Sequence, residues 1–253
     1  MKNMRRVFYL GVIIIISGIL SSCTTVVRKP SVQLPQEICP QPTGSVLRHD
    51  VFHVVAPGET LWRISKMYDV PMPDILRANS LKNKEELKKG QRLLVPAAAP
   101  IAPVIALYPS DKWKYIVVHH SGTDEGSSLD FDKYHSSKGW AGVGYHFIIA
   151  NGTKTKQDGQ IEVSPRWIKQ QNGAHCQAGG MNYKGIGVCV VGNFNQERVS
   201  QKQMDSLVYL VNTLREYYNI SSKNIIGHRQ VRGAKTDCPG KYFPWVEFKE
   251  RLH

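Results

Sequence analysis

Short apolar runs alternate with helical apolar periodicity through the C-terminal half of the chain. The runs at 115–119, 143–150 and 186–191 are rich in β-branched and aromatic residues, so they predict buried strands. After Ser200 the apolar residues adopt helical spacing, and Gln203 three positions later completes a capping-box sequence. The apolar face of this predicted helix consists of Met204, Leu207, Val208, Val211 and Leu214.

The same pattern supplies the remaining elements of this region. Asn151-Gly152 is a strong hairpin-turn signal, which predicts a return strand over 153–156. A short strand is predicted over 224–227 and a closing helix over 245–252. Strands interleaved with helices indicate an α/β domain over residues 112–253, with a mixed central β-sheet flanked by helices.

A separate segment, residues 51–96, has its own pattern of strand, helix, helix and strand. Val54-Val55 predicts a short strand, and Thr60 is a suitable N-cap for a helix whose apolar residues recur at helical spacing. A second short helix is predicted over 74–79 and a closing strand over 92–95. The segment is therefore expected to form a small βααβ module.

These landmarks resemble a LysM module. The segment begins H-V-V-A-P-G-E-T-L-W-R-I-S-K-M-Y at 53–68 and ends G-Q-R-L-L-V-P at 90–96, so the match covers nearly all of it. LysM modules bind the N-acetylglucosamine-containing backbone of peptidoglycan or chitin. The resemblance implies a glycan-binding surface along 58–61 and in the loop after Asn79.

The N-terminus has the pattern of an export signal. Positively charged residues precede the 14-residue apolar run 7–20, which is too short for an ordinary membrane span. The run ends in Leu20-Ser21-Ser22-Cys23, which resembles the lipobox of bacterial lipoproteins. The resemblance implies a signal peptide over 1–22 and lipid attachment to Cys23. In the alternative, a plain secretory signal, the cysteine would be incidental.

A lipid anchor would place the mature protein in the bacterial cell envelope. Thr24, rather than aspartate, after the lipidated cysteine would favour the outer membrane of a Gram-negative cell, facing the periplasm. Residues 23–50 carry Pro, Ser, Thr and Gln without periodicity and predict a flexible tether. Residues 97–111 are rich in Pro and Ala and predict a semi-rigid linker.

The composition and net charge of the chain indicate which kinds of molecule it could bind. Hydrophobic residues make up 42% of the chain, enough for a buried core, and the formal net charge is +13. This excess suits an anionic partner such as nucleic acid, phospholipid or an acidic cell-wall polymer. Because the chain has no long run of Lys and Arg, nucleic acid is not predicted as a partner. Nothing in the sequence calls for more than a monomer.

Two segments of the C-terminal domain could together offer a metal ion two imidazoles and one thiolate. V-V-H-H-S-G-T at 117–123 puts histidine at the end of an apolar strand, and G-H-R-Q-V-R-G-A-K-T-D-C-P-G at 227–240 supplies a further histidine and a cysteine. Successive strand side chains alternate faces, so only one of His119 and His120 can point at the ion. Three protein ligands with one open position are typical of catalytic zinc.

Four motifs in order across 117–240 point to one family. They read H-H-S-G-T, G-W-A-G-V-G-Y-H-F-I-I, G-A-H…N-Y-K-G-I-G-V-C-V-V-G-N-F and G-H-R…C-P-G. Together they resemble the type 2 N-acetylmuramoyl-L-alanine amidases, which include phage lysozyme-type amidases and peptidoglycan recognition proteins. The resemblance implies Zn²⁺ held by His119, His228 and Cys238. It also implies hydrolysis of the amide bond between N-acetylmuramic acid and L-alanine in peptidoglycan, for cell-wall remodelling or recycling.

The same resemblance assigns two catalytic roles. Tyr145, in G-Y-H-F, matches the family tyrosine near the attacking water, although packing beside Phe147 and Ile149 on one strand face would also explain an aromatic residue. Thr236, two positions before the cysteine, matches the residue that stabilises the transition state. Lys235 stays an alternative, because the interval from histidine to cysteine is two residues longer than in many relatives.

Further residues have weaker signals. His175 and Asn182 fall in the segment that by resemblance borders the substrate groove. Cys189 is expected in a buried strand, at a position where the branch acting on anhydro-muropeptides carries glutamate. A Cys39–Cys176 disulfide is conceivable.

Other functions fit part of the sequence. A non-catalytic peptidoglycan-binding recognition lipoprotein would usually have replaced the cysteine ligand. A purely structural tether needs only the lipid and the LysM module. A zinc endopeptidase would cut a peptide bond instead. Retention of all three candidate ligands favours an enzyme over the first two alternatives.

Overall fold

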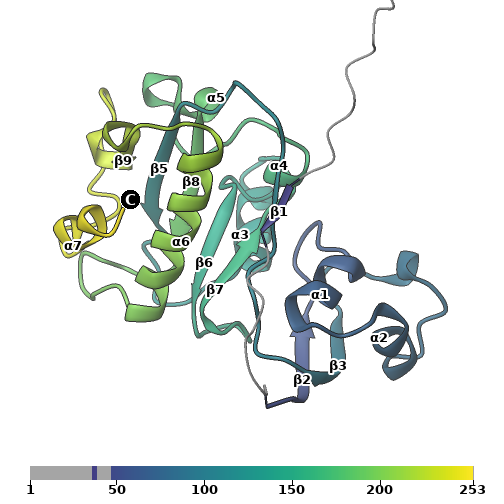
Figure 1. Cartoon of the computed structure of the whole chain (residues 1–253). Coiled ribbons are helices and arrows are strands. Elements are labelled where there is room, and N and C mark those ends of the chain that lie inside the picture. Colours follow the sequence, from purple (N-terminus) through teal and green to yellow (C-terminus); the bar gives the residue numbers. More distant parts are fainter. Residues whose placement is uncertain (1–35, 39–46, 253) are drawn as a thin grey trace, which may run out of the picture. The chain divides into compact units, whose positions relative to one another are not determined.

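The computed structural model describes residues 36–38 and 47–252 (Figure 1). The predicted signal peptide over 1–22, the lipidation site Cys23, most of the tether and Cys39 lie outside the described residues. Within the described ranges, no helix has both the length and the apolar character needed to cross a membrane.

The C-terminal domain is built on a five-stranded sheet in the order β7-β6-β8-β5-β9. Its strands are β5 (Tyr115–His120), β6 (Phe147–Asn151), β7 (Asp158–Val163), β8 (Gly185–Val190) and β9 (Ile225–Gly227). β8 pairs in parallel with β5 and β6, β5 pairs in parallel with β9, and β7 runs antiparallel to β6. The predicted mixed sheet is therefore confirmed.

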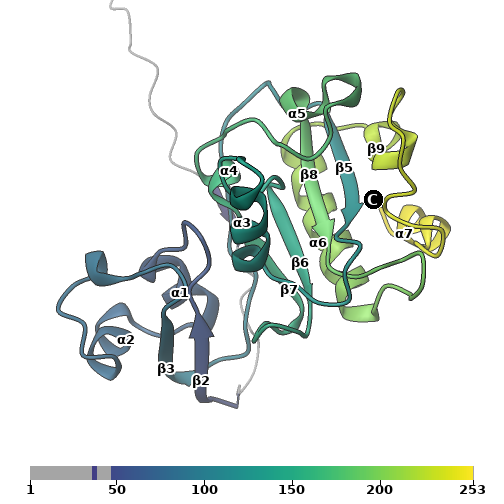
Figure 2. The same cartoon turned by 180° about the vertical axis from the view of Figure 1, so that it is seen from behind.

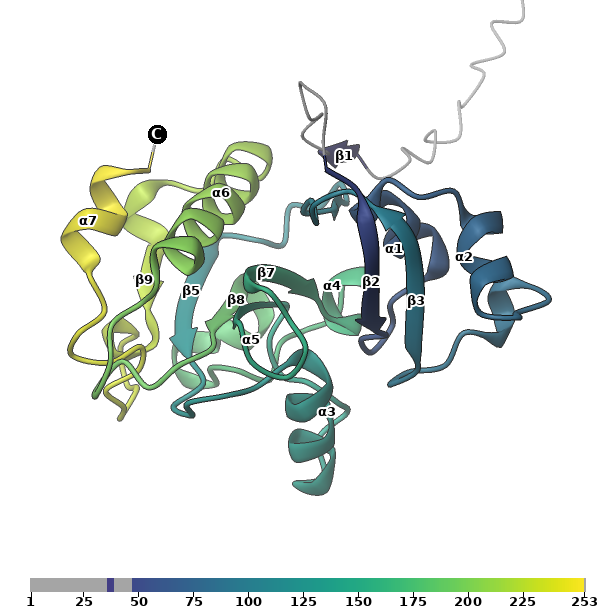
Figure 3. The same cartoon turned by 90° about the horizontal axis from the view of Figure 1, so that it is seen from below.

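Helices cover both faces of this sheet, with α6 on one side and α3 on the other (Figures 2 and 3). They are α3 (Ser128–Ser137), α4 (Pro165–Ile168), α5 (Met181–Lys184), α6 (Gln201–Tyr217) and α7 (Trp245–Glu250). The predicted capping box begins α6: Ser200 accepts from the Gln203 N–H, and the Gln203 side chain accepts from the Ser200 N–H. The apolar face of α6 is buried in the main core.

Two local predictions in this domain were wrong. The return strand begins at Asp158 and not in the 153–156 segment, because Lys154 and Thr155 have φ of 51° and 62°, in the left-handed region that a strand cannot use. The strand predicted from Val143 begins only at Phe147. Tyr145 precedes it and packs with Ile148, in a cluster separate from the main core.

The N-terminal module has the predicted βααβ order. It consists of β2 (His49–Val54), α1 (Leu61–Tyr68), α2 (Met72–Ala78), the 3-10 turn Lys84–Glu86 and β3 (Arg92–Ala98). β2 and β3 pair antiparallel, and the apolar sides of both helices join them in a core of their own. Thr60 caps α1 as predicted by accepting the Arg63 N–H at 3.2 Å.

The segment expected to be a linker, 97–111, is packed in this structure. β3 continues to Ala98, and β4 (Ile105–Leu107) pairs with β1 (Gln36–Ile38). Val104 is buried in the core of the module, whereas its neighbour Ile105 is buried in the core of the C-terminal domain. Burial of these apolar side chains orders the segment despite its Pro- and Ala-rich composition.

In the stretch 58–61, Gly58 and Thr60 are exposed, whereas Leu61 and the side chain of Glu59 are covered. Thr60 caps α1, and Gly58 adopts φ of 74° in a turn. A Cβ at Gly58 would lie 3.1 Å from the side chain of Pro165 in α4. The glycan contact predicted for this stretch stays a prediction, and each of these residues has a structural task.

A buried contact between His53 and Glu59 links β2 to the turn before α1. His53 Nε2 lies 2.7 Å from Glu59 Oε2, which also accepts the Ala56 N–H at 2.8 Å. Burial by itself raises the pKa of Glu59, but the adjoining His53, with Arg63 and Lys156 farther off, outweighs it and lowers the pKa from 4.5 to about 2. The folded module therefore stabilises the ionised form of the Glu59 side chain relative to its protonated form.

This shift predicts an acid-sensitive contribution to stability. The contribution of Glu59 is present above pH 4.5 and is lost as the pH falls toward about 2, because its folded-state pKa is the lower one. Glu59→Gln should lower the free energy of unfolding at pH 7 by about 1–3 kcal/mol. Urea unfolding at pH 7 and pH 3 should show a smaller loss on acidification in the variant than in the wild type. An equal loss in both would contradict the prediction.

Candidate metal centre

Parallel pairing brings two of the predicted ligands together. β5 and β9 pair with Val118 opposite Gly227, so the residues that follow each, His119 and His228, emerge side by side. Cys238 arrives from the loop that precedes α7. One ligand atom from each of these three residues lies within 4.8 Å of the others. The structure thus gathers the three residues that the motifs selected.

The distances within this group fit a tetrahedral ion. His119 Nδ1 lies 3.6 Å from Cys238 Sγ. Zinc binds nitrogen at about 2.0–2.1 Å and sulfur at about 2.3 Å, so tetrahedral ligands of these types lie about 3.6 Å apart. Two imidazoles and a thiolate also form a donor set that suits zinc. The residues present therefore fit a zinc ion, and their role as ligands stays a prediction.

Burial sets the protonation of the candidate ligands. Desolvation, reinforced by the facing histidines His175 and His228, lowers the pKa of His119 well below its ordinary value. Burial likewise lowers the pKa of His228 and raises the pKa of the Cys238 thiol to about 12. The imidazoles are thus neutral with a free lone pair, and metal binding must displace the proton of the thiol.

His120 belongs to a different environment from His119. His119 is buried, whereas His120 is partly exposed, and its Nδ1 accepts the Phe194 N–H at 3.2 Å. Its own backbone N–H points at Cys238 Sγ at 3.4 Å, a contact that favours the thiolate form. The alternation of strand side chains therefore separates the two histidines as expected.

Tyr145 lies beside the cluster. The centroid of its ring is 5.3 Å from that of His119, and it packs against Phe131. Burial, with the nearby thiols of Cys189 and Cys238, raises the pKa of its hydroxyl well above the ordinary value of 10. The phenol is therefore protonated at physiological pH and can donate a hydrogen bond to a developing negative charge.

The two alternatives in the loop before the cysteine differ in their contacts. Thr236 is half-buried, and its Oγ1 accepts the Cys238 N–H at 3.1 Å, so it shapes the approach of the sulfur to the cluster. Lys235 is exposed. The contact of Thr236 favours it over Lys235 as a residue held near the reaction, and its catalytic role stays a prediction.

His175 and Asn182 form a support behind the cluster. His175 is buried and its Nδ1 lies 3.0 Å from His119 Nε2. Asn182 Oδ1 accepts the backbone N–H groups of His175 and Cys176, both at 2.8 Å. Burial lowers the pKa of His175 to about 4, so this imidazole is neutral. Their predicted contact with substrate stays a prediction.

Two hollows adjoin the cluster. One, of about 490 Å³, contains Tyr145 and is walled by α3, with Phe131, Tyr134 and His135 in its lining. The other, of about 450 Å³, contains His228 and His175 together with Trp140. Trp140 stacks on His135, with 4.8 Å between the ring centroids.

The sequence did not predict that α3 lines the hollow beside Tyr145, because only the tertiary fold brings this helix there. In the sequence, Phe131, Tyr134 and His135 belong to a short helix with no distinctive motif. Their spacing along one helix was the only available signal, and it indicates an apolar face without indicating what that face would meet.

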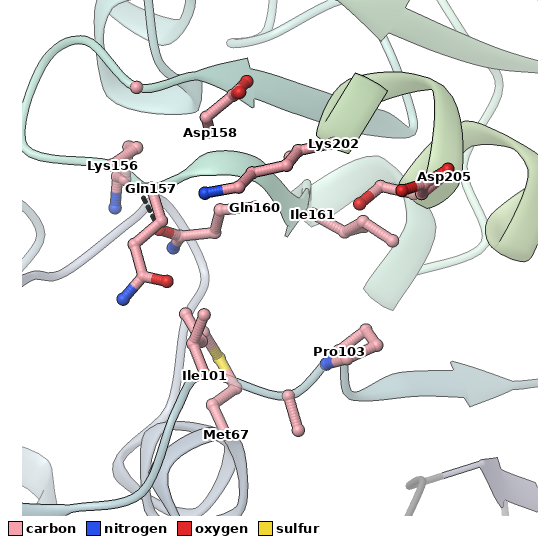
Figure 4. Close-up of a pocket in the computed structure, with 14 residues that line it drawn as sticks. Met67, Ile101, Pro103, Lys156, Gln157, Asp158, Gln160, Ile161, Lys202 and Asp205 are labelled. Atoms are coloured by element: carbon pink, nitrogen blue, oxygen red, sulfur yellow. Dashed lines mark hydrogen bonds between the residues drawn. The ribbon is translucent and has the colours of Figure 1, made fainter. Parts of the chain in front are cut away.

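A separate hollow of about 630 Å³ shares no residue with the cluster (Figure 4). Met67 and residues 101–103 line it, together with β7, the loop before β7 and the start of α6. Asp158, Lys202 and Asp205 give it a polar lining. None of its lining residues is a histidine or a cysteine, so it offers no comparable set of metal ligands.

Family models match two regions of the chain. The model described as N-acetylmuramoyl-L-alanine amidase matches residues 109–241, and the LysM domain model matches residues 53–96.

Individual relatives match the C-terminal domain. Peptidoglycan-recognition protein SC2 of Drosophila melanogaster is 32% identical over 145 residues, which are 53% of this chain and 72% of that protein. The endolysin of Escherichia phage T7 is 32% identical over 132 residues, 49% of this chain and 78% of the endolysin. The solved structure of the N-acetylmuramoyl-L-alanine amidase LysC from Clostridium intestinale URNW is 35% identical and covers 56% of this chain and 88% of its own, with a TM-score of 0.47.

Proposed function

This chain belongs to the family of N-acetylmuramoyl-L-alanine amidases, and from that premise we propose that Zn²⁺ held by His119, His228 and Cys238 carries its catalysis. The observation that carries the proposal is the convergence of three ligand atoms within 4.8 Å, beside the protonated hydroxyl of Tyr145. A recognition protein that had lost its metal would not need this donor set.

In this proposal, the zinc ion and the residues around it have separate roles in the hydrolysis of the amide bond. When bound, zinc with three protein ligands lowers the pKa of a water ligand toward about 7 and polarises a carbonyl oxygen. Tyr145 donates a hydrogen bond to the oxyanion that forms when the amide carbonyl is attacked. Thr236 accepts the Cys238 backbone N–H, and in this proposal its hydroxyl supplies a second donor to the oxyanion. The bond cleaved joins the lactyl group of N-acetylmuramic acid to L-alanine.

An extended polymer suits the hollows on either side of the cluster. One hollow reaches Tyr145 and the other reaches His228, so a substrate that occupied both would pass over the candidate ligands. The LysM domain supplies a second contact with the same peptidoglycan. Two linked sites on one polymer raise the effective concentration of substrate at the catalytic centre, even when the second site is weak.

The N-terminal motif supports an anchored location. The lipobox-like Leu20-Ser21-Ser22-Cys23 would attach a lipid at Cys23 after removal of residues 1–22. The anchored chain would act as a monomer in the bacterial cell envelope, at the outer membrane and facing the periplasm in a Gram-negative cell. Mass spectrometry of the mature N-terminus checks this, since a cleaved but unlipidated cysteine would contradict it.

Digestion of purified peptidoglycan tests the function directly. The chain starting at Thr24 should release stem peptides beginning with L-alanine, identified by mass spectrometry, and a chelator should stop the release until zinc is added back. Fragments cut within the stem peptide would indicate an endopeptidase. Binding to the wall without any release would favour the non-catalytic alternative.

Tyr145→Phe tests the proposed hydrogen bond to the oxyanion. Removing one donor of this kind costs about 10²-fold or more in kcat, with little change in KM, because the contact forms only in the transition state. Steady-state kinetics on a soluble muropeptide measures both constants. Because the ring also packs against Phe131, an unchanged melting temperature is needed as a control. A change in KM alone would argue that the tyrosine contributes only to binding.

A further inference from the structure

Two successive hydrogen bonds, which meet at the imidazole of His175, connect β8 to the candidate metal ligand His119. The carbonyl oxygen of Gly185, the first residue of β8, lies 3.2 Å from His175 Nε2. A carbonyl oxygen only accepts hydrogen bonds, so His175 Nε2 must carry a proton and donate. In a neutral imidazole with a proton on Nε2, Nδ1 has a lone pair and accepts.

The next contact follows from the first. His175 Nδ1 lies 3.0 Å from His119 Nε2, so His119 Nε2 carries a proton and donates to it. His119 Nδ1 is then unprotonated, and this is the nitrogen that lies 3.6 Å from Cys238 Sγ. The direction of donation thus leaves the lone pair of His119 pointing at the candidate metal position.

We propose that His175 is a positioning residue that holds His119 in the tautomer and ring orientation required to bind zinc. The inference rests on the proposed zinc site, and it assigns His175 a task other than the substrate contact predicted for it. Metal-bound histidines commonly donate their second N–H to a carboxylate, carbonyl or water. Here a neutral imidazole that is itself fixed by a backbone carbonyl takes that place.

Two glycines make room for the imidazole ring of His175. A Cβ at Gly173 would lie 2.3 Å from His175 Cδ2, and one at Gly187 would lie 2.4 Å from the same atom. The imidazole therefore occupies a slot that only glycine permits on both sides. Asn182 Oδ1 accepts the backbone N–H groups of His175 and of the next residue, Cys176. A rigid acceptor of this kind transmits its orientation to His119.

Two variants separate the acceptor from the donor of His175. Asparagine places its side-chain oxygen where Nδ1 lies, so His175→Asn keeps the acceptor for His119 and loses the bond to Gly185. Glutamine reaches the position of Nε2, so His175→Gln keeps the bond to Gly185 and loses the acceptor. Zinc affinity of the full chain, measured by chelator competition, should fall about 10- to 100-fold in His175→Gln. It should stay close to the wild-type value in His175→Asn.

Replacing zinc by Co²⁺ gives a readout that does not depend on activity. The wild type and His175→Asn should share the visible absorption bands of a tetrahedral site with a thiolate ligand, and His175→Gln should lose them. Equal zinc affinities in wild type and His175→Gln would overturn the inference, as would equal losses in both variants when both fold with the wild-type melting temperature. Failure of the wild type itself to bind zinc would instead overturn the proposed zinc site.

Discussion

Cys238→Ala is expected to abolish the release of stem peptides and to remove the bound zinc. The substitution deletes one of three ligands from a cluster in which Cys238 Sγ lies 3.6 Å from His119 Nδ1, and it adds no other donor. Loss of the whole electrophilic centre should cost more than loss of one oxyanion donor, that is, more than about 10³-fold in kcat/KM. Elemental analysis after dialysis and digestion of peptidoglycan measure the two effects on the same sample.

Cys189→Ala is the matched control for metal content. This thiol is also buried, but it lies in β8 and outside the group of candidate ligands. The control should retain one zinc per chain, whereas Cys238→Ala should retain almost none. Full activity of Cys238→Ala in the presence of a strong chelator would contradict the proposed mechanism. Loss of zinc from both variants would show that the assay reports damage to the core and not ligation.

Lys156→Met is expected to lower the free energy of unfolding by breaking a buried ion pair. Lys156 and Glu162 form an ion pair at 3.3 Å with side chains only 3% and 2% exposed, and Lys156 Nζ also donates to the Val54 carbonyl at 2.8 Å. Without the lysine, the buried Glu162 carboxylate loses its counter-charge and keeps the Ser128 N–H, and the Val54 carbonyl loses the ammonium donor. Breaking a buried pair in this way costs about 3–5 kcal/mol, which denaturant unfolding would detect as a lower midpoint.

Two comparisons sharpen this prediction. Burial raises the pKa of Glu162, so Lys156→Met combined with Glu162→Gln should recover part of the loss, because the Glu162 carboxylate is then no longer buried without its lysine. Lys154→Met removes the exposed pair of Lys154 with Glu125 and should leave the unfolding midpoint unchanged. A loss in Lys156→Met as small as that in Lys154→Met would contradict a role for the buried pair.

Structural elements that depend only on residues close together in the sequence were predicted correctly. The helix after Ser200 and the cap at Thr60 appear where their residues indicated, because a capping residue needs only the next few N–H groups. The main sheet followed from its apolar runs. The return strand after Asn151-Gly152 was misplaced, because the positive φ values at Lys154 and Thr155 lengthen the turn in a way that the turn signal does not specify.

Contacts between residues far apart in sequence needed the structure. Tyr145 was expected to share a strand face with Phe147, yet the strand begins only at Phe147, so the tyrosine joins a separate cluster near His119. The segment 97–111 was expected to be a semi-rigid linker because it is rich in Pro and Ala. Its buried positions are determined by the two cores between which it lies.

The amino-acid sequence by itself determined the family, the order of elements and the donor atoms available to a metal, because motifs and periodicities are properties of the chain alone. Only the tertiary structure decided how these donors are used. The pairing of Val118 with Gly227 brings His119 beside His228, and the slot between Gly173 and Gly187 holds His175 against His119. Sheet register and close packing produce both contacts, and neither leaves a local pattern in the sequence.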